Sequence, residues 1–187
     1  MKPLTTIFFD NDGVLVDTEK LFCEANQVMF DEMGIPHTTE DFQNYQQITN
    51  IGSAGFLKRF EFNDQAIKTF KEKRDKIWNK KVEAGHHVVP QAEAVLVQLS
   101  KKYRLCMATS ASKTHYEWAH QATNILPLFE QVVGRDECQI LKPDPEVYLK
   151  ALELMGVSSD ESIVIEDTPR GIASGQAAGV RVVAIRN

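Results

Sequence analysis

The chain has 187 residues, of which 43% are hydrophobic and 25% are charged, and its formal net charge is −5. This length suits one sizeable domain or a core with a small accessory domain. The acidic balance without a basic run argues against nucleic-acid binding, and no apolar stretch approaches the roughly 20 residues that span a bilayer. The cysteines, Cys23, Cys106 and Cys138, are widely spaced, so we expect buried thiols in a reducing cytoplasm rather than a disulfide framework.

The first predicted element is a strand over residues 5–9, TTIFF, and acidic residues follow it at once. Asp10 and Asp12 are separated by one asparagine, and Gly13 comes next. Clustered carboxylates repel one another and raise each other's pKa unless a cation lies among them. The end of this strand is therefore the first candidate for a functional site.

The next segment, residues 18–85, contains no convincing strand. Helical patterns cover residues 18–34, which Gly34 is placed to end, and residues 64–85. This segment predicts a helical bundle inserted between the first strand and the rest of the chain.

From residue 90 onward, helices and apolar strands alternate. The expected helices cover 90–102, 112–124 and 144–156, and the expected strands cover 103–109, 131–134, 162–166 and 180–186. Near-continuous apolar strands are typical of parallel sheets that are covered on both faces. The fold class is therefore α/β, with an open, doubly wound parallel sheet.

Polar motifs follow these strands. Residues 10–13 follow the first strand, 109–112 the second and 166–168 the strand over 162–166, while Lys142 lies just before the helix over 144–156. Ligands of open α/β sheets bind beyond the carboxyl ends of the strands, so we expect the four motifs to converge on one edge. Each motif alone is weak evidence, since an Asp-x-Asp sequence can equally be a metal-free turn or a helix cap.

Together these residues favour phosphate chemistry. Hard oxygen ligands without cysteine or histidine favour Mg²⁺, which prefers a phosphate as a partner ligand. Ser110 and backbone N–H groups at a helix start suit phosphate oxygens, and Lys142 adds positive charge. No Ser–His or Cys–His pair is evident, so one carboxylate would be the nucleophile and a second would move protons.

The same motifs resemble those of the haloacid dehalogenase superfamily of phosphohydrolases, in particular its β-phosphoglucomutase-like branch. FFDNDGVLVDTE is similar to the first motif of that family, ATSAS to the second, KPDPEVY to the third and IEDTPRGIASGQAAG to the fourth. The resemblance implies a Rossmann-like core over 1–16 and 86–187 with a helical cap over 17–85. It also implies an aspartate nucleophile, an aspartate acid/base and Mg²⁺ as the cofactor.

By this resemblance, Asp10 is the nucleophile and Asp12 the acid/base. Asp10 and Asp167 would bind Mg²⁺ through their side chains and Asp12 through its backbone carbonyl, while Glu166 could contact the ion through water.

The resemblance also implies the groups that hold the phosphate. Ser110 and Ala111 would bind it, with Thr109 as an alternative for the hydroxyl, and Lys142 would pair with both Asp10 and the phosphate.

The chain departs from the mutases of this branch at two places. Phe22 stands where they carry a histidine, and the cap loop over 44–52 offers amides rather than a basic pair. We therefore expect a Mg²⁺-dependent phosphatase of a small phosphorylated metabolite, such as a sugar phosphate. A phosphomutase, in which Lys58 or Arg59 would hold a second phosphate, and a non-catalytic binding protein stay as alternatives.

Some expectations concern the rest of the molecule. We expect a cytoplasmic monomer or weak dimer that binds neither nucleic acid nor membranes. His86 and His87 are expected in a solvated loop. The sequence ends soon after its last strand, where members of this branch continue with another helix, so we expect one face of the sheet to be less covered.

Overall fold

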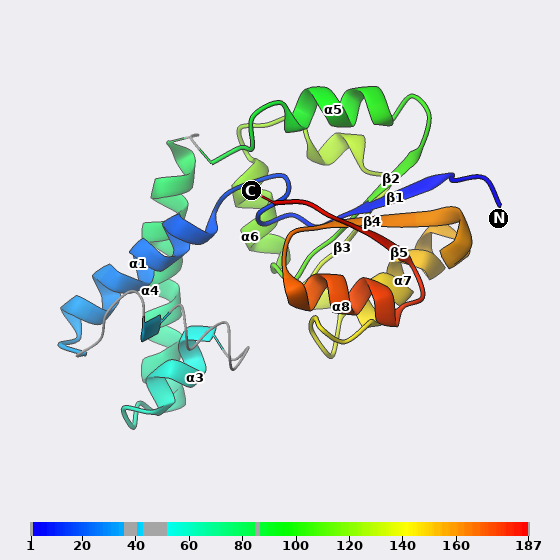
Figure 1. The fold of residues 1–187 in the computed structure, drawn as a ribbon. Coiled ribbons are helices and arrows are strands. Elements are labelled where there is room, and N and C mark those ends of the chain that lie inside the picture. The colour runs from blue at the N-terminus through cyan, green and yellow to red at the C-terminus, as the bar shows by residue number, and fades with distance from the viewer. Residues whose placement is uncertain (1, 36–40, 43–51, 85–86, 187) are drawn as a thin grey trace. The chain divides into compact units, whose positions relative to one another are not determined.

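A computed structural model of the chain describes residues 2–35, 41–42, 52–84 and 87–186. The chain divides into two compact units, one formed by Met1–Asp17 with His86–Asn187 and the other by Thr18–Gly85 (Figure 1). The first unit contains the sheet, and the elements described in the second are helices.

The first unit is built on a five-stranded sheet in the order β3-β2-β1-β4-β5. Its strands are β1 (Thr6–Phe9), β2 (Arg104–Ala108), β3 (Gln131–Val133), β4 (Ser162–Glu166) and β5 (Arg181–Ala184). Every neighbouring pair is parallel, and Phe8 of the central strand lies beside Cys106 of β2 and Val164 of β4. This arrangement confirms the expected α/β fold with a Rossmann-like parallel sheet.

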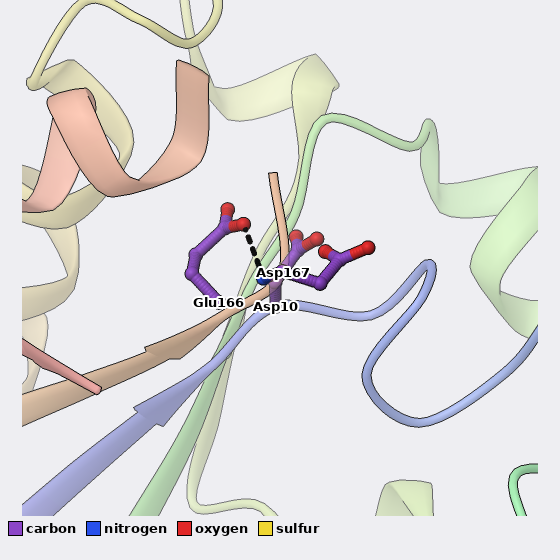
Figure 2. Close-up of side chains that lie close together, drawn as sticks. All are labelled: Asp10, Glu166 and Asp167. Carbon is purple, nitrogen blue, oxygen red and sulfur yellow. Dashed lines mark hydrogen bonds between the residues drawn. The ribbon is translucent and has the colours of Figure 1, made fainter. Parts of the chain in front are cut away.

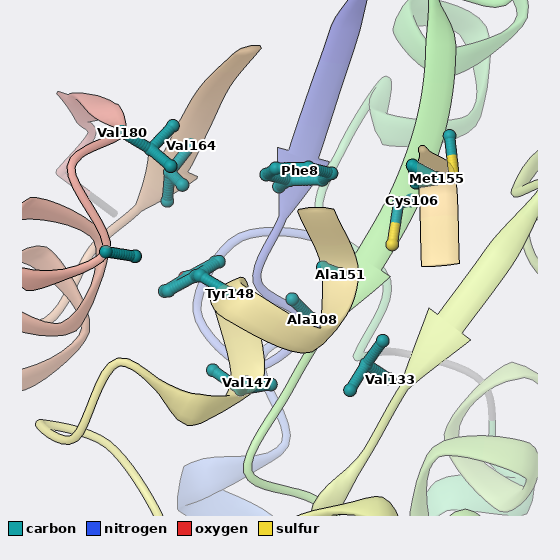
Figure 3. Packing of buried hydrophobic residues seen from close by; sticks show 11 residues of the cluster. Phe8, Cys106, Ala108, Val133, Val147, Tyr148, Ala151, Met155, Val164 and Val180 are labelled. Atoms are coloured by element: carbon teal, nitrogen blue, oxygen red, sulfur yellow. The ribbon is translucent and has the colours of Figure 1, made fainter. Parts of the chain in front are cut away.

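Side chains of β1 alternate between two cores, one on each face of the sheet. Phe8 packs against α7 (Glu146–Met155) through Tyr148, on the face that also carries α8 (Pro169–Ala177) (Figure 3). Ile7 and Phe9 pack on the other face, which carries α5 (Ala92–Leu99) and α6 (Lys113–His120). Because β1 is buried on both faces, its end is a rigid position for a reactive side chain.

Local signals set the ends of several helices. The Ser112 side chain accepts a hydrogen bond from His115 N and begins α6, as expected of an N-cap. Gly156 ends α7 with a φ of 62°, a left-handed conformation that glycine adopts readily.

Within the residues that the structure describes, no helix is both long enough and apolar enough to cross a membrane. The cytoplasmic location stays a prediction.

The second unit contains α1 (Glu19–Glu32), α3 (Gly52–Lys58) and α4 (Asp64–Glu83). Its core is aromatic: the Phe30 ring lies 5.2 Å, between centroids, from each of Phe42, Phe56 and Phe70. The predicted helices over 18–34 and 64–85 are thus present. The cap loop over 44–52, with Gln46, Gln47 and Asn50, lies largely outside the described residues.

One expectation is wrong. His87 is buried rather than solvated, and its Nε2 lies 2.6 Å from the carbonyl oxygen of Ala119; His86 lies outside the described residues. The strand β5 is partly exposed, since Val183 is 45% exposed and Ala184 is also exposed. This exposure agrees with the expectation that one face of the sheet is less covered.

Candidate active site

The candidate site lies where β1 ends, and its centre is the ion pair between Asp10 and Lys142. Lys142 Nζ donates hydrogen bonds to Asp10 Oδ1 at 2.7 Å, to Glu166 Oε1 at 2.8 Å and to the Ala108 carbonyl oxygen at 2.9 Å. Lys142 is only 3% exposed. A buried ammonium group needs such partners, because an unpaired charge in the interior is very costly. The lysine thereby ties together the carboxyl ends of β1, β2 and β4.

Glu166 is fully buried, and both of its carboxylate oxygens have partners. Oε1 accepts from Lys142 and, at 3.3 Å, from the Tyr148 hydroxyl. Oε2 accepts from the backbone N–H groups of Asp167 and Thr168 and from Thr168 Oγ1, each at 3.0 Å. Glu166 thus fixes the start of α8 and the position of Lys142.

A group of three carboxylates lies at this edge of the sheet. Ligand atoms of Asp10, Glu166 and Asp167 all lie within 4.8 Å of one another (Figure 2). An all-oxygen set of this kind fits a hard cation such as Mg²⁺. Since Glu166 already accepts several hydrogen bonds, Asp10 and Asp167 are better placed to bind an ion directly.

The pKa values of the three buried charged groups, Asp10, Glu166 and Lys142, are shifted in different directions. Burial raises the pKa of Asp10 to about 7; Lys142 opposes this rise, whereas the carboxylates of Glu166 and Asp12 add to it. Burial would also raise the pKa of Glu166, but Lys142 and the hydrogen bonds from Thr168 hold it below its usual value. Burial would lower the pKa of Lys142, yet Asp10 and Glu166 hold it above its usual value. Asp10 is therefore the carboxyl group that would gain most from a further cation.

The turn after β1 brings Asp12 and Gly13 to the same edge. Gly13 has a φ of 83°, and a Cβ atom on it would lie 2.0 Å from Asp167 Oδ2. Only glycine therefore allows this backbone to lie against the Asp167 carboxylate. Asp12 is half-buried, and its Oδ2 accepts a hydrogen bond from Asn11 Nδ2 at 3.3 Å.

The residues predicted to hold phosphate follow β2 at this edge. Thr109 is buried, and its Oγ1 accepts a hydrogen bond from Ala111 N at 3.0 Å. Ser110 is half-buried, so its hydroxyl is the more accessible of the two. Asp10, Lys142, Glu166 and Asp167 are thus brought into one cluster, while Ser110 and Ala111 lie in the loop that follows the neighbouring strand β2.

Gly171 on α8 gives a direct test of the Glu166 position. A Cβ atom there would lie 1.6 Å from Glu166 Oε1, so Gly171→Ala must displace a carboxylate that is held by five hydrogen bonds. We expect the free energy of unfolding, measured with urea, to fall by about 1–3 kcal/mol, although alanine has the higher helix propensity. The exposed Gln176→Ala on the same helix is the control and should change it by less than about 0.5 kcal/mol. A Gly171→Ala protein as stable as wild type would contradict this account of Glu166.

Comparison with known proteins places this site in a family. A family model described as haloacid dehalogenase-like hydrolase matches residues 7–185. The chain belongs to this hydrolase family. The expectation of an enzyme of the haloacid dehalogenase type is confirmed, and relatives named as phosphatases support the phosphoric monoester hydrolase class.

Individual relatives of this haloacid dehalogenase-like chain are distant but cover nearly all of it. A phosphorylated carbohydrates phosphatase of Thermotoga maritima is 27% identical over 95% of this chain and 82% of its own. The chloroplastic protein SUPPRESSOR OF QUENCHING 1 of Arabidopsis thaliana is 29% identical over 98% of this chain, which spans only 18% of that protein. The crystal structure of CbbY from Rhodobacter sphaeroides with phosphate has a TM-score of 0.83 at 21% identity, covering 98% of this chain and 87% of its own. That last likeness shows a shared fold.

Three residues of the haloacid dehalogenase-like site were given no role from the sequence. Tyr148 donates to Glu166, and its ring centroid lies 4.9 Å from Lys142 Nζ. Asn11 and His120 are joined by a hydrogen bond across 109 residues of sequence. The position of Tyr148 on the buried stripe of its helix was readable, but nothing local marks the pairing of Asn11 with a distant histidine.

Proposed function

We propose that this chain is a Mg²⁺-dependent phosphatase that hydrolyses a small phosphorylated metabolite, such as a sugar phosphate, through an aspartyl-phosphate intermediate. The observation that carries the proposal is the buried Asp10–Lys142 ion pair among carboxylates at the end of the central strand. The names of relatives, among them the phosphorylated carbohydrates phosphatase of Thermotoga maritima, add support.

In the first half of the proposed reaction, a carboxylate oxygen of Asp10 attacks phosphorus while the bond from phosphorus to the ester oxygen breaks. Asp12 gives its proton to that leaving oxygen. Lys142, Ser110 and the backbone N–H of Ala111 bind the phosphoryl oxygens and stabilise their charge. The product alcohol leaves, and phosphate stays bound to Asp10.

In the second half, Asp12 acts as a base. It takes a proton from a water molecule whose oxygen attacks phosphorus, which releases inorganic phosphate and restores both aspartates. A Mg²⁺ ion held by Asp10, Asp167 and the Asp12 backbone carbonyl would neutralise phosphate charge and lower the pKa of Asp10.

Selection of the substrate is assigned to the helical unit. We infer that residues 17–85 act as a cap that recognises the part of the substrate beyond its phosphate, as the sequence resemblance implies. Lys58 and Arg59 are the basic residues of this unit that were expected to hold a second phosphate in a mutase. Both have partners already: Lys58 Nζ lies 3.5 Å from Asp64 Oδ1, and the Arg59 guanidinium lies over the Phe56 ring. This favours hydrolysis over a mutase reaction, which must hold a bisphosphate.

Parallel assays of inorganic phosphate and glucose 6-phosphate test the proposal. The protein is given Mg²⁺ and β-glucose 1-phosphate with a trace of the bisphosphate, and a panel of other phosphorylated metabolites is screened alongside. We expect phosphate release that EDTA stops and that needs no bisphosphate. Fast formation of glucose 6-phosphate with negligible phosphate release would instead assign a mutase, and binding without turnover of any compound would assign a non-catalytic protein.

A further inference from the structure

A chain of hydrogen bonds leads from Asp12 into the interior. Asn11 Nδ2 donates to Asp12 Oδ2 at 3.3 Å, and Asn11 Oδ1 lies 2.7 Å from His120 Nε2. Asn11 is 1% exposed and His120 is 3% exposed, so water does not compete for the bond between these two side chains. His120 comes from the last turn of α6, far along the chain from the first motif.

The Asp12 carboxylate, at one end of this chain, determines which nitrogen of His120 carries a proton at the other end. A carboxylate only accepts hydrogen bonds, so Asn11 must turn its NH₂ group toward Asp12 and its oxygen toward His120. His120 must then carry its proton on Nε2 and donate it to Asn11. Its Nδ1 lies 3.2 Å from the Thr123 hydroxyl, which also donates to the His120 carbonyl oxygen at 3.1 Å. Burial, aided by the nearby His87, lowers the pKa of His120 to about 4, so the ring is neutral and the contact with Asn11 selects the tautomer with the proton on Nε2.

The backbone of Asn11 is fixed as well. Its carbonyl oxygen accepts from the N–H groups of Leu15 at 2.8 Å and Val16 at 3.1 Å, which closes the turn after β1. The Asn11 side chain therefore extends from a fixed backbone position between Asp12 and His120.

We propose that Asn11 and His120 are positioning residues that orient the Asp12 carboxylate for proton transfer, with His120 fixing which end of the Asn11 amide faces Asp12. The proposal rests on the proposed function, in which Asp12 protonates the leaving group. Neither residue touches the substrate; each acts through its neighbour.

The test compares two substrates that differ in their need for an acid. The leaving group of p-nitrophenyl phosphate departs readily, whereas that of phenyl phosphate depends more on protonation. In His120→Met, which has no donor, we expect kcat/KM to fall about 10- to 100-fold for phenyl phosphate but less than about threefold for p-nitrophenyl phosphate. In His120→Gln, whose amide can donate from nearly the same place, both values should stay close to wild type.

His87→Met is the matched control. His87 is about as buried as His120 and lies near it, but its Nε2 contacts the Ala119 carbonyl oxygen rather than Asn11. In His87→Met, the ratio of kcat/KM for phenyl phosphate to kcat/KM for p-nitrophenyl phosphate should equal that of wild type. Equal losses on both substrates in His120→Met, or no loss on either, would overturn the proposal.

A measurement without turnover separates this proposal from the proposed function. Nitrogen NMR of the ¹⁵N-histidine-labelled wild-type protein, assigned by the signal that is lost in His120→Gln, reports the tautomer directly. We expect a neutral His120 with its proton on Nε2, and a proton on Nδ1 would overturn the proposal even if His120→Met did not fold. A further outcome is a wild-type protein that shows the Nε2 tautomer and yet hydrolyses neither p-nitrophenyl phosphate nor phenyl phosphate. In that case the proposed function would fail, while the chain of hydrogen bonds from Asp12 to His120 would stand.

Discussion

Replacing Asp10 by asparagine should reduce turnover at least about a hundredfold while the fold is retained, since loss of a covalent catalyst raises the barrier by several kcal/mol. The amide is nearly the same size, but it is a poor nucleophile and a weaker ligand for Mg²⁺. Lys142 keeps Glu166 as a partner in this variant, so the buried ammonium stays paired. Turnover is measured as phosphate release under saturating substrate, and circular dichroism checks the fold. A variant that retains more than about a hundredth of the wild-type rate would reject Asp10 as the nucleophile.

The same substitution should make the metal-free protein more stable at neutral and higher pH. The pKa of Asp10 rises from an ordinary 3.8 to about 7, so between these values the folded chain holds a proton that the unfolded chain has released. The free energy of unfolding therefore falls as pH rises through this window, and the loss is complete above it. Asparagine has no such proton. In EDTA near pH 8 we expect Asp10→Asn to be about 1–3 kcal/mol more stable than wild type, with the difference vanishing near pH 3.

The second large effect is expected from Lys142→Met, which removes the cation between two buried carboxylates. Asp10 and Glu166 would be left facing each other at the end of the sheet, and loss of one partner from a buried ion pair costs about 3–5 kcal/mol. Turnover should fall at least about a hundredfold, because the charge on the phosphoryl group loses its stabilising cation. Urea unfolding at neutral pH and phosphate release measure the two effects.

Two further variants sharpen the Lys142 test. Lys150→Met removes a lysine from the surface of α7, where it pairs with Glu146 at 2.7 Å, and it should change neither quantity appreciably. Combining Lys142→Met with Glu166→Gln removes one of the two repelling charges, so part of the lost stability should return while activity does not. A Lys142→Met protein that is as stable as wild type would show that these carboxylates do not depend on the lysine.

Much of the fold could be predicted because local sequence carries it. The strand predicted over 162–166 is β4 (Ser162–Glu166), since a short apolar run lies there between polar segments. The positions of Asp10 and Lys142 followed from topology, because motifs at the carboxyl ends of parallel strands meet at one edge. The apolar composition of β5 indicates a strand but not what packs on it, and its exposure agrees with the expectation of a less covered face of the sheet.

The environment of polar residues was harder to predict. Asn11 reads in the sequence as a spacer between two aspartates, and His87 as part of a solvated loop. Both are buried, because their partners, His120 and the Ala119 carbonyl, come from a helix far along the chain. A buried polar side chain is defined by the group that satisfies it, and a single sequence does not reveal that group when it is distant.

The central position of β1 bears on how the protein is made. Of the five strands, β1 is synthesised first, yet both of its neighbours in the sheet come much later, and Lys142 follows Asp10 by 132 residues. At a synthesis rate of about 5–20 residues per second, the apolar strand waits roughly 10 to 30 seconds before β4 exists to pair with it. Such non-local pairing slows folding and leaves the strand accessible to chaperones on the ribosome. The nascent chain thus carries its reactive aspartate long before it can form the site that makes the aspartate reactive.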